Sequence, residues 1–349
     1  TLFPYTTLFR SRNLSANLSK KIFYLGWLGH GNLGDEISFT AFKKLFANAG
    51  MRCYKLKNIG KIPAKANVFL GGGTLVGEPS FLKNMSLLLE KEAALFIFGT
   101  GARSEIYFDV RKYSCAHFSE MSKWQEAIKN SPAIFLRGEE SAKILNLPKL
   151  KIISDIALSA CKSSLKIPRK RIVGINIGCH TIEYGNQQKI NIEIVKTIEY
   201  LLKNNFQIEF IPMHKIDFDI MNELNKKYNL GVRIWKRYLN PKKTVKRFLK
   251  YYMVIGQRFH SCVISSGCGV PSLPLVYSSK YSEFLSQMSL TKYAIQTDKI
   301  SSEALIGKIE EITANYTEIK KSLISLSNHY KDLQKSAAKE IVSIIKYGK

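Results

Sequence analysis

Arg258, His260 and Lys280 are the residues whose types and spacing best suit chemistry on an anionic substrate. An arginine fork binds carboxylate or phosphate oxygens in pairs, and a histidine changes its charge near neutral pH. No Asp or Glu lies between Gly256 and Lys280. Taken singly, Arg258 could pair with a structural carboxylate, His260 could be an ordinary helix-start residue, and Lys280 could be a solvated lysine. Their grouping favours an anion site that includes a proton-transfer group.

The elements around these residues predict a strand-turn-helix-turn-strand unit. Residues 252–255 form a short apolar run typical of a strand, residues 260–266 predict a short helix, and residues 273–277 predict the next strand. Arg258 then lies just before a helix N-terminus, where free backbone N–H groups and the helix dipole favour an anion. Lys280 follows the carboxyl end of a strand, which is where ligands bind in open α/β sheets.

The ordered motifs of the chain resemble a known family. The pattern G-x-R-F-H-S-x-V-x-S-x-x-x-G-V-P-x-L-P-L-x-Y-x-x-K begins at Gly256. It is preceded by GWLGHGNLGDE at residues 26–36, GGGTL at 71–75, RGEES at 137–141 and SDIAL at 154–158. Together these segments resemble the polysaccharide pyruvyl transferase family, which moves the enolpyruvyl unit of phosphoenolpyruvate onto a sugar as a ketal. Phe259 is a departure, because related proteins often carry leucine there.

The resemblance implies a donor site for phosphoenolpyruvate in the C-terminal half of the chain. Its carboxylate and phosphate would be held by Arg258, by the N–H groups around Phe259 and His260, and by Arg137 reaching from the other half. His260 would be the general acid or base, and Lys280 would donate a proton or stabilise the leaving phosphate. Which of these two residues gives the proton stays open.

The resemblance also implies an acceptor site in the N-terminal half. Asn32 and Asp35 would hold hydroxyl groups of a sugar or of a lipid-linked glycan precursor, and Gly72 and Gly73 would form a close-approach turn. Such turns also serve simply to let a strand meet a helix, and that structural alternative is kept for these glycines.

Alternating strand and helix patterns predict an α/β fold with mainly parallel sheets. The resemblance implies a GT-B-like architecture, in which two Rossmann-like domains face a cleft and a C-terminal helix crosses back to the first domain. The expected strands are residues 21–28, 52–56, 68–70, 94–98, 133–137, 151–153, 172–177, 207–211, 232–235, 252–255, 273–277 and 293–296.

The expected organisation has five parts. Residues 1–19 are expected to be an adapter-like artefact or disordered arm, because residues 1–11 can be back-translated into a common sequencing-adapter sequence. The remaining parts are an N-terminal acceptor-side domain at 20–160, a polar linker at 161–171, a C-terminal phosphoenolpyruvate-side domain at 172–300, and amphipathic helices at 301–349.

The glycine loop at residues 29–34 satisfies G-x-G-x-x-G after a predicted strand, so dinucleotide binding is a rival hypothesis. The next strand and its exit, residues 52–57, contain no carboxylate for the ribose hydroxyls of NAD, although Lys55 or Lys57 could contact the extra phosphate of NADP. Asp35 fits poorly beneath a phosphate and has a structural alternative as a helix cap. An NADP-binding oxidoreductase therefore stays open.

Two further alternatives remain. A sugar-nucleotide glycosyltransferase could have the same fold, but such enzymes commonly hold the ribose with a C-terminal glutamate, and residues 256–280 contain none. A non-enzymatic polyanion-binding protein would rest on charge alone.

Composition limits the compartment and the partners. The 349 residues carry a formal charge of +26, from 53 Lys and Arg against 27 Asp and Glu, which favours polyanions or an anionic membrane surface. We find no zinc-finger spacing, RNP motif or helix-turn-helix and expect no nucleic-acid partner. The densest basic run, residues 236–250, is expected to be a helix with a solvated basic face. A cytoplasmic protein, with peripheral contact to the inner membrane as one option, is the expectation.

The six cysteines show no C-x-x-C pairing and are expected to be reduced and mostly buried. No motif indicates a resident cofactor or a metal site. Cys179, His180 and His214 are possible metal ligands, but histidines of unknown separation are more often ordinary loop residues.

Overall fold

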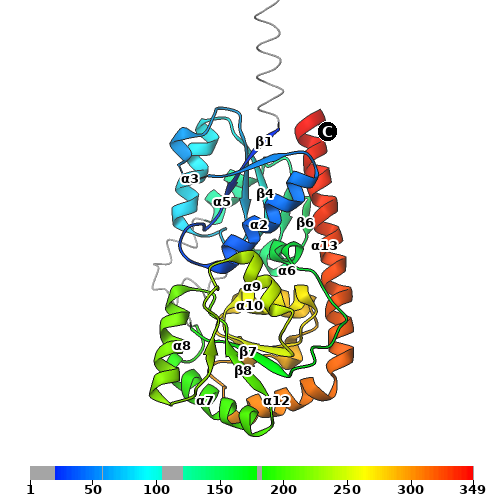
Figure 1. The fold of residues 1–349 in the computed structure, drawn as a ribbon. Helices are drawn as coiled ribbons and strands as arrows, with labels where there is room; N and C mark the ends of the chain where they lie inside the picture. Colours follow the sequence, from blue (N-terminus) through cyan, green and yellow to red (C-terminus); the bar gives the residue numbers. More distant parts are fainter. Residues whose placement is uncertain (1–19, 57, 104–120, 179–182, 349) are drawn as a thin grey trace, which may run out of the picture.

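Two six-stranded parallel sheets form the framework of the protein. The computed structural model describes residues 20–56, 58–103, 121–178 and 183–348 (Figure 1). The predicted arm at residues 1–19 lies outside this range. The expected α/β fold with two parallel sheets is confirmed, and each of the twelve strands of these sheets matches an expected one within a few residues.

The first sheet has the strand order β2-β1-β3-β4-β5-β6, and every neighbouring pair is parallel. Its strands are β1 (Lys21–Leu25), β2 (Arg52–Lys55), β3 (Asn67–Gly71), β4 (Ala94–Thr100), β5 (Ile134–Leu136) and β6 (Leu150–Ile152). The chain order reverses between β1 and β3, so this is where the sheet has its topological switch point.

The second sheet has the order β12-β11-β10-β7-β8-β9, again with parallel pairs. Its strands are β7 (Ile172–Asn176), β8 (Gln207–Phe210), β9 (Arg233–Ile234), β10 (Met253–Gly256), β11 (Ser272–Val276) and β12 (Ile295–Gln296). The switch point falls between β7 and β10. The proposed linker, residues 161–171, runs between the two sheets.

Helices follow most strands and cover the sheets (Figure 1). In the first half they are α2 (Leu33–Asn48), α3 (Pro79–Glu90), α5 (Met121–Ile128) and α6 (Glu139–Leu145). In the second half they are α7 (Gln187–Lys203), α8 (Lys215–Lys227), α9 (Pro241–Phe248), α10 (Phe259–Cys268), α11 (Ser282–Gln287), α12 (Ser302–Ala314) and α13 (Tyr316–Tyr347). The expected basic helix is the short α9, whose Lys242, Lys243 and Lys246 are exposed.

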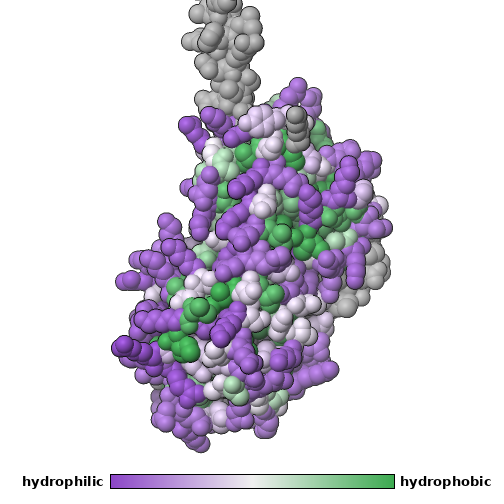
Figure 2. All heavy atoms as spheres, turned by 90° about the vertical axis from the view of Figure 1, so that its right-hand side faces the viewer, coloured by the Kyte–Doolittle hydropathy of each residue, from purple (hydrophilic) through white to green (hydrophobic). Residues whose placement is uncertain are grey.

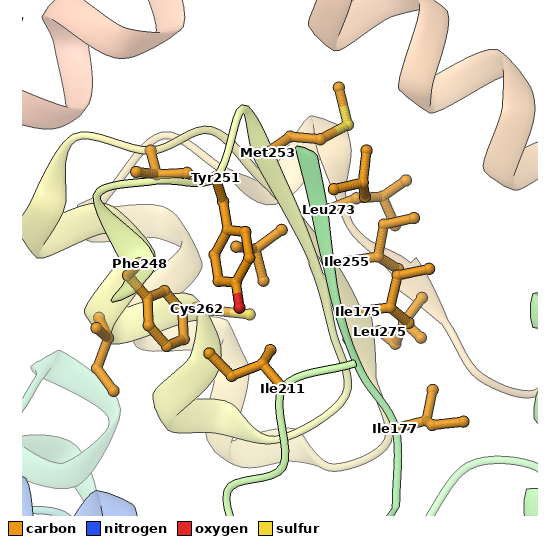
Figure 3. Packing of buried hydrophobic residues seen from close by; sticks show 14 of the residues in the cluster. Ile175, Ile177, Ile211, Phe248, Tyr251, Met253, Ile255, Cys262, Leu273 and Leu275 are labelled. Carbon is orange, nitrogen blue, oxygen red and sulfur yellow. The ribbon is translucent and has the colours of Figure 1, made fainter. Parts of the chain in front are cut away.

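Aromatic side chains build the core between α2 and the first sheet. Phe42 and Phe46 of α2 pack edge-on against Phe69 of β3 and Phe98 of β4. The core around the second sheet is mainly aliphatic, with aromatic side chains such as Phe248 and Tyr251 among its members. Figure 3 shows Met253 and Ile255 of β10 on one side of the strands, with Tyr251 on the other. Both faces of this sheet are buried, as expected for a parallel sheet wrapped by helices.

The C-terminal helix α13 connects the two halves. Its first turns pack in the core of the second half, and Ala337, Ala338, Ile341 and Val342 pack in the core around the first sheet (Figure 1). The C-terminal helix therefore crosses back to the first half of the chain, as the family resemblance implies. Among the described residues, no helix combines the length and the apolar character needed to cross a membrane. The cysteines described, Cys53, Cys161, Cys262 and Cys268, are free, and three of them are buried.

Gln334 of α13 holds the segment that leads into the short helix η3 (Ile156–Ala160). Its side-chain amide donates to the carbonyl oxygens of Ile153 and Asp155, each at 2.9 Å, and accepts a hydrogen bond from the Ser159 hydroxyl at 2.5 Å. Gln334 is completely buried. Its loss would leave buried carbonyl groups without a partner, which is costly.

We expect Gln334→Ala to lower the free energy of unfolding by about 2–4 kcal/mol, because three buried hydrogen bonds are lost together. Chemical denaturation measures this quantity. The matched control is Ser336→Ala, an exposed position on the same helix, which should change stability by less than about 0.5 kcal/mol. Equal effects of the two substitutions would contradict the role given to Gln334.

Candidate functional site

A cleft of about 620 Å³ lies between the two halves, at the carboxyl ends of both sheets. It is lined by residues that follow β1 and β3 in the first half and β10 and β11 in the second. The two topological switch points therefore open into one cavity, as expected for ligand sites of open α/β sheets. Of the predicted site residues, those that line the cleft are Asn32, Asp35, Gly73, Arg137, Arg258, Phe259, His260 and Lys280.

Gly72 is the predicted site residue that packs elsewhere. Its backbone has φ of +69°, and a Cβ at this position would lie 2.7 Å from the Tyr24 hydroxyl and 3.1 Å from Cβ of Ser38. Only glycine fits such a position without strain. Gly73, with φ of +60°, faces Asp35 in the cleft. The structural alternative stated for these glycines thus applies to Gly72.

Arg258 occupies the N-cap position of α10, and its guanidinium is already paired with a carboxylate. Its guanidinium contacts Asp217 of α8 through Nε at 3.0 Å and Nη2 at 2.5 Å, and Asp217 is fully buried. The backbone N–H of Arg258 donates to the Asn176 side chain at 2.8 Å. Sequence reasoning missed Asp217. The signal was available, because Asp217 follows β8 at the same edge of the sheet as Arg258.

Arg137 reaches from the first half into the second, as the family resemblance implies, and meets a glutamate there. Its Nε lies 2.7 Å from Oε1 of Glu283 on α11, and both side chains are buried. The Ser141 hydroxyl also donates to Glu283, and the Arg137 guanidinium lies 4.8 Å from the ring centroid of Phe259. Glu283 stands three positions beyond Lys280. The cleft therefore does contain a glutamate from the second half, but its carboxylate is held by Arg137 and Ser141, which disfavours a ribose-binding role.

His260 lies in the first turn of α10 and faces a second buried carboxylate. Its Nε2 is 3.7 Å from Oδ2 of Asp155, and both atoms are buried without a hydrogen-bond partner among the described residues. Burial lowers the pKa of His260, Asp155 raises it, and the charges of Lys280 and Arg137 lower it further. The neutral imidazole is thus favoured near pH 7. A neutral imidazole accepts protons, which suits a general base.

Gly34 explains why this ring can lie so close to α2. A Cβ at Gly34 would be 2.0 Å from Nδ1 of His260. The last glycine of the G-x-G-x-x-G pattern therefore allows close packing of α2 against α10. Backbone N–H groups of the loop are also engaged, since Gly29 donates to Glu36 and Leu33 donates to the Met213 carbonyl. This use of the loop argues against a pyrophosphate cradle.

Asp35 is a buried carboxyl group in the first turn of α2. The helix cap is Asn32, whose side chain accepts from the Gly34 N–H at 3.1 Å, so the cap expected at Asp35 lies three residues earlier. Burial, and then the charge of Asp155, raise the pKa of Asp35 to about 7, against the opposing charges of Lys280 and Arg258. Near neutral pH this group can give or take a proton.

Lys280 lies in the short helix η4 (Ser279–Tyr281) at the exit of β11. Its ammonium group donates to the Tyr277 hydroxyl and lies 4.5 Å from the centroid of that ring. The neighbouring Ser278 and Ser279 are held by Glu183 at 2.6 and 2.8 Å. No group of three or more His, Cys, Asp or Glu that could hold a metal ion occurs among the described residues.

Acidic and basic residues are equally numerous in the lining of the cleft. Its lining contains four acidic residues, Asp35, Glu78, Glu140 and Glu283, and four basic ones, Arg103, Arg137, Arg258 and Lys280. Arg103 pairs with Glu78, so three arginines of the cleft each have a carboxylate partner. The arrangement can bind an anion that displaces or shares one of these carboxylates, and it can transfer protons through His260 and Asp35.

Comparisons with known proteins agree with this architecture. The sequence model of the polysaccharide pyruvyl transferase family matches residues 13–279. No curated protein matches the sequence. Among solved structures, MnaA of S. aureus, solved with UDP, has a TM-score of 0.61 at 12% identity, with 94% of this chain and 96% of that chain covered.

Two other similar structures belong to the same GT-B-like group. UDP-GlcNAc 2-epimerase of Neisseria meningitidis has a TM-score of 0.53 at 12% identity, covering 93% of this chain and 98% of that one. The pneumococcal O-GlcNAc transferase GtfA has a TM-score of 0.51 at 11% identity, covering 82% of this chain and 58% of that one. At these identities the likeness concerns the fold alone.

The raised pKa of Asp35 predicts a specific dependence of stability on pH. The unfolded carboxyl releases its proton near pH 3.8, whereas the folded one keeps it up to about pH 7. Between these values the unfolded state binds fewer protons, so the contribution of Asp35 to stability falls as pH rises. Asp35→Asn does not titrate. Its melting temperature should therefore gain roughly 5 °C over wild type between pH 4 and pH 7, and little more above that.

Glu36→Gln is the matched control with the opposite sign. Burial opposes the shift, but the hydrogen bonds from Lys55 and Gly29 lower the pKa of Glu36. The contribution of Glu36 to stability is present above pH 4.5, the pKa of the unfolded carboxyl group. It is lost as the pH falls through the lower pKa of the folded state. Glu36→Gln should thus cost stability at pH 7 and cost nothing in acid. A pH-independent effect of Asp35→Asn would show that Asp35 is ionised in the folded protein.

Proposed function

This chain belongs to the polysaccharide pyruvyl transferase family, and on that premise we propose that it transfers pyruvate as a ketal from phosphoenolpyruvate to a sugar of a cell-surface glycan precursor. One observation carries the proposal. Arg137 of the first half converges with Arg258, His260 and Lys280 of the second half in a single cleft. These are the residue types needed to hold a donor with three negative charges and to move protons around it.

The donor would bind at the N-terminus of α10. Its carboxylate and phosphate would contact Arg258, the backbone N–H groups of Phe259 and His260, and Arg137. Both arginines have carboxylate partners, so donor oxygens must share a guanidinium with Asp217 or Glu283, or replace these partners. The bidentate contact with Asp217 fixes the plane of the Arg258 guanidinium, which favours a planar, paired acceptor such as a carboxylate.

The acceptor sugar would enter from the first half, beside Asn32, Asp35 and Gly73. Asp35 is suited to hold a sugar hydroxyl because its carboxyl group can accept a hydrogen bond when ionised and donate one when protonated. The lipid-linked form of the acceptor is part of this proposal. The cleft is open enough, at about 620 Å³, for a donor and a sugar ring together.

The reaction would proceed by protonation of the methylene carbon of phosphoenolpyruvate, which makes C2 electrophilic. One sugar hydroxyl attacks C2 and loses its proton, and the bond between C2 and the phosphate oxygen breaks. A second hydroxyl then attacks C2 and closes the ketal ring. The two hydroxyl groups release two protons in total. One replaces the proton taken up by the methylene carbon, and the other is carried away by the released phosphate.

The surroundings of His260 suit removal of a hydroxyl proton, because its lowered pKa keeps the ring neutral. Asp155 would stabilise the imidazolium that forms, since it lies 3.7 Å away and is buried. Lys280 would protonate the methylene carbon in the first step or stabilise the departing phosphate. His260 and Lys280 are therefore the proposed catalytic residues.

Incubation with phosphoenolpyruvate and candidate sugars tests the function directly. We expect a pyruvyl adduct by mass spectrometry, together with release of inorganic phosphate. Arg258→Lys keeps the charge and loses the fork, so donor affinity should fall by about 2 kcal/mol or more. Arg233→Lys, at an exposed arginine outside the cleft, is the control and should bind donor as wild type does.

Other outcomes would point to the rival functions. Transfer from a nucleotide sugar, without any pyruvyl product, would identify a glycosyltransferase. Reduction of NADP would identify an oxidoreductase. If Arg258→Lys bound phosphoenolpyruvate as tightly as wild type, the donor site would lie elsewhere.

His260→Ala separates a catalytic from a structural histidine. If His260 is the proton-transfer group, His260→Ala should fold normally, lose little donor binding and reduce turnover by about 10²- to 10⁴-fold. Single-turnover rate and melting temperature are measured on the same preparation, with the exposed His329→Ala as control. A destabilised variant that keeps full turnover would leave Lys280 as the remaining candidate.

A further inference from the structure

A second cavity, of about 560 Å³, lies on the side of the molecule that carries α13. Its walls come from the C-terminal half of α2, from residues 159–163 after η3, and from α13. In Figure 1 the blue α2 and the red α13 lie side by side, and the two helices are in contact. Figure 2 looks at the α13 side, where the surface is mainly hydrophilic. We call this cavity the lysine pocket.

The lysine pocket concentrates positive charge without a compensating carboxylate in its lining. Lys44, Lys162, Lys331, Lys335 and Lys339 line it, and no Asp or Glu does. The cleft, by contrast, has equal numbers of acidic and basic lining residues. Like charges gathered around one partly enclosed space repel one another, and that repulsion is relieved when an anion enters.

Three of these lysines are held in place, two of them by neutral groups. Lys44 donates to the Ser159 carbonyl at 3.3 Å, and Lys331 donates to the Gly267 carbonyl at 2.8 Å. A carbonyl orients an ammonium group but leaves its charge uncompensated. Lys335 pairs with Asp332 at 2.7 Å outside the lining. Burial lowers the pKa of Lys331, against the opposing effect of Cys161 and Cys268, and the charges of Lys44 and Lys335 lower it by smaller amounts.

We propose that the lysine pocket binds a diphosphate or triphosphate anion. Each phosphate group brings up to about two negative charges, so two or three linked phosphates match the lysines of the lining. Asn48, Asn328 and Ser163 add polar groups for the remaining phosphate oxygens. Because the lysines come from α2, from the segment after η3 and from α13, a bound anion contacts all three and stabilises their packing. This proposal is independent of the transferase function.

Pyrophosphate and tripolyphosphate are the probes, used with the full chain in calorimetry and thermal unfolding. We expect saturable binding at one site and a rise in melting temperature of about 4 °C at a hundredfold excess over Kd for a chain of 349 residues. Sulfate at equal ionic strength should give a smaller rise. The double variant Lys162→Ala/Lys339→Ala, at two exposed lysines, should bind at least about tenfold more weakly.

The control variant is Lys321→Ala/Lys346→Ala, which removes the same charge from exposed positions of α13 outside the pocket and should bind as wild type does. Three results would overturn the proposal: no saturable binding, equal loss of affinity in both double variants, or loss of binding in Arg258→Ala with normal binding in Lys162→Ala/Lys339→Ala. The last of these would place the anion in the cleft.

Discussion

The close approach of α2 to α10 determines the geometry of the cleft. The ring of His260 occupies the space that a Cβ of Gly34 would need, with 2.0 Å between that position and Nδ1. Since α2 packs on the first sheet and α10 on the second, this contact is one of those that fix the distance between the two halves. At this distance the Leu33 N–H reaches the Met213 carbonyl, and Arg137 reaches Glu283. A larger residue at position 34 would force the halves apart and separate the groups of the site.

The C-terminal helix α13 holds the segments that carry both members of the His260–Asp155 pair. Lys320 and Lys331 of α13 donate to the carbonyls of Gly269 and Gly267, at the C-terminal end of α10. The first turn of α10 contains His260. Gln334, one turn further, holds the carbonyl of Asp155. Burial of an imidazole beside a carboxylate is costly unless the surrounding structure prevents both from moving to water. The long C-terminal helix thus has a direct connection to the His260–Asp155 pair, although it does not line the cleft.

Local patterns in the sequence predicted the strands, the glycine turns and the strand-helix unit around Arg258, because each depends on neighbouring residues. Pairing of Arg258 with a structural carboxylate was one of the alternatives, but the partners in the ion pairs of the cleft were not predicted, since they lie far from the arginines in the chain. Asp217 is 41 positions from Arg258, and Glu283 is 146 positions from Arg137. The role of the glycine loop at residues 29–34 also could not be predicted from the local sequence. Its pattern fits a phosphate cradle or a close helix contact equally well, and only the position of His260 distinguishes them.

The balanced charge of the cleft has a consequence for anion recognition. The chain carries +26, yet the three arginines that face the cleft are each paired with a carboxylate, so the excess charge lies elsewhere on the molecule. A paired guanidinium keeps its orientation, and an anion gains by contacting it only if its oxygens match the fork well enough to compete with the carboxylate. Simple anions such as chloride cannot do this. In the proposed donor site, the overall positive field would raise the local concentration of all anions, and the paired arginines would then select among them by geometry.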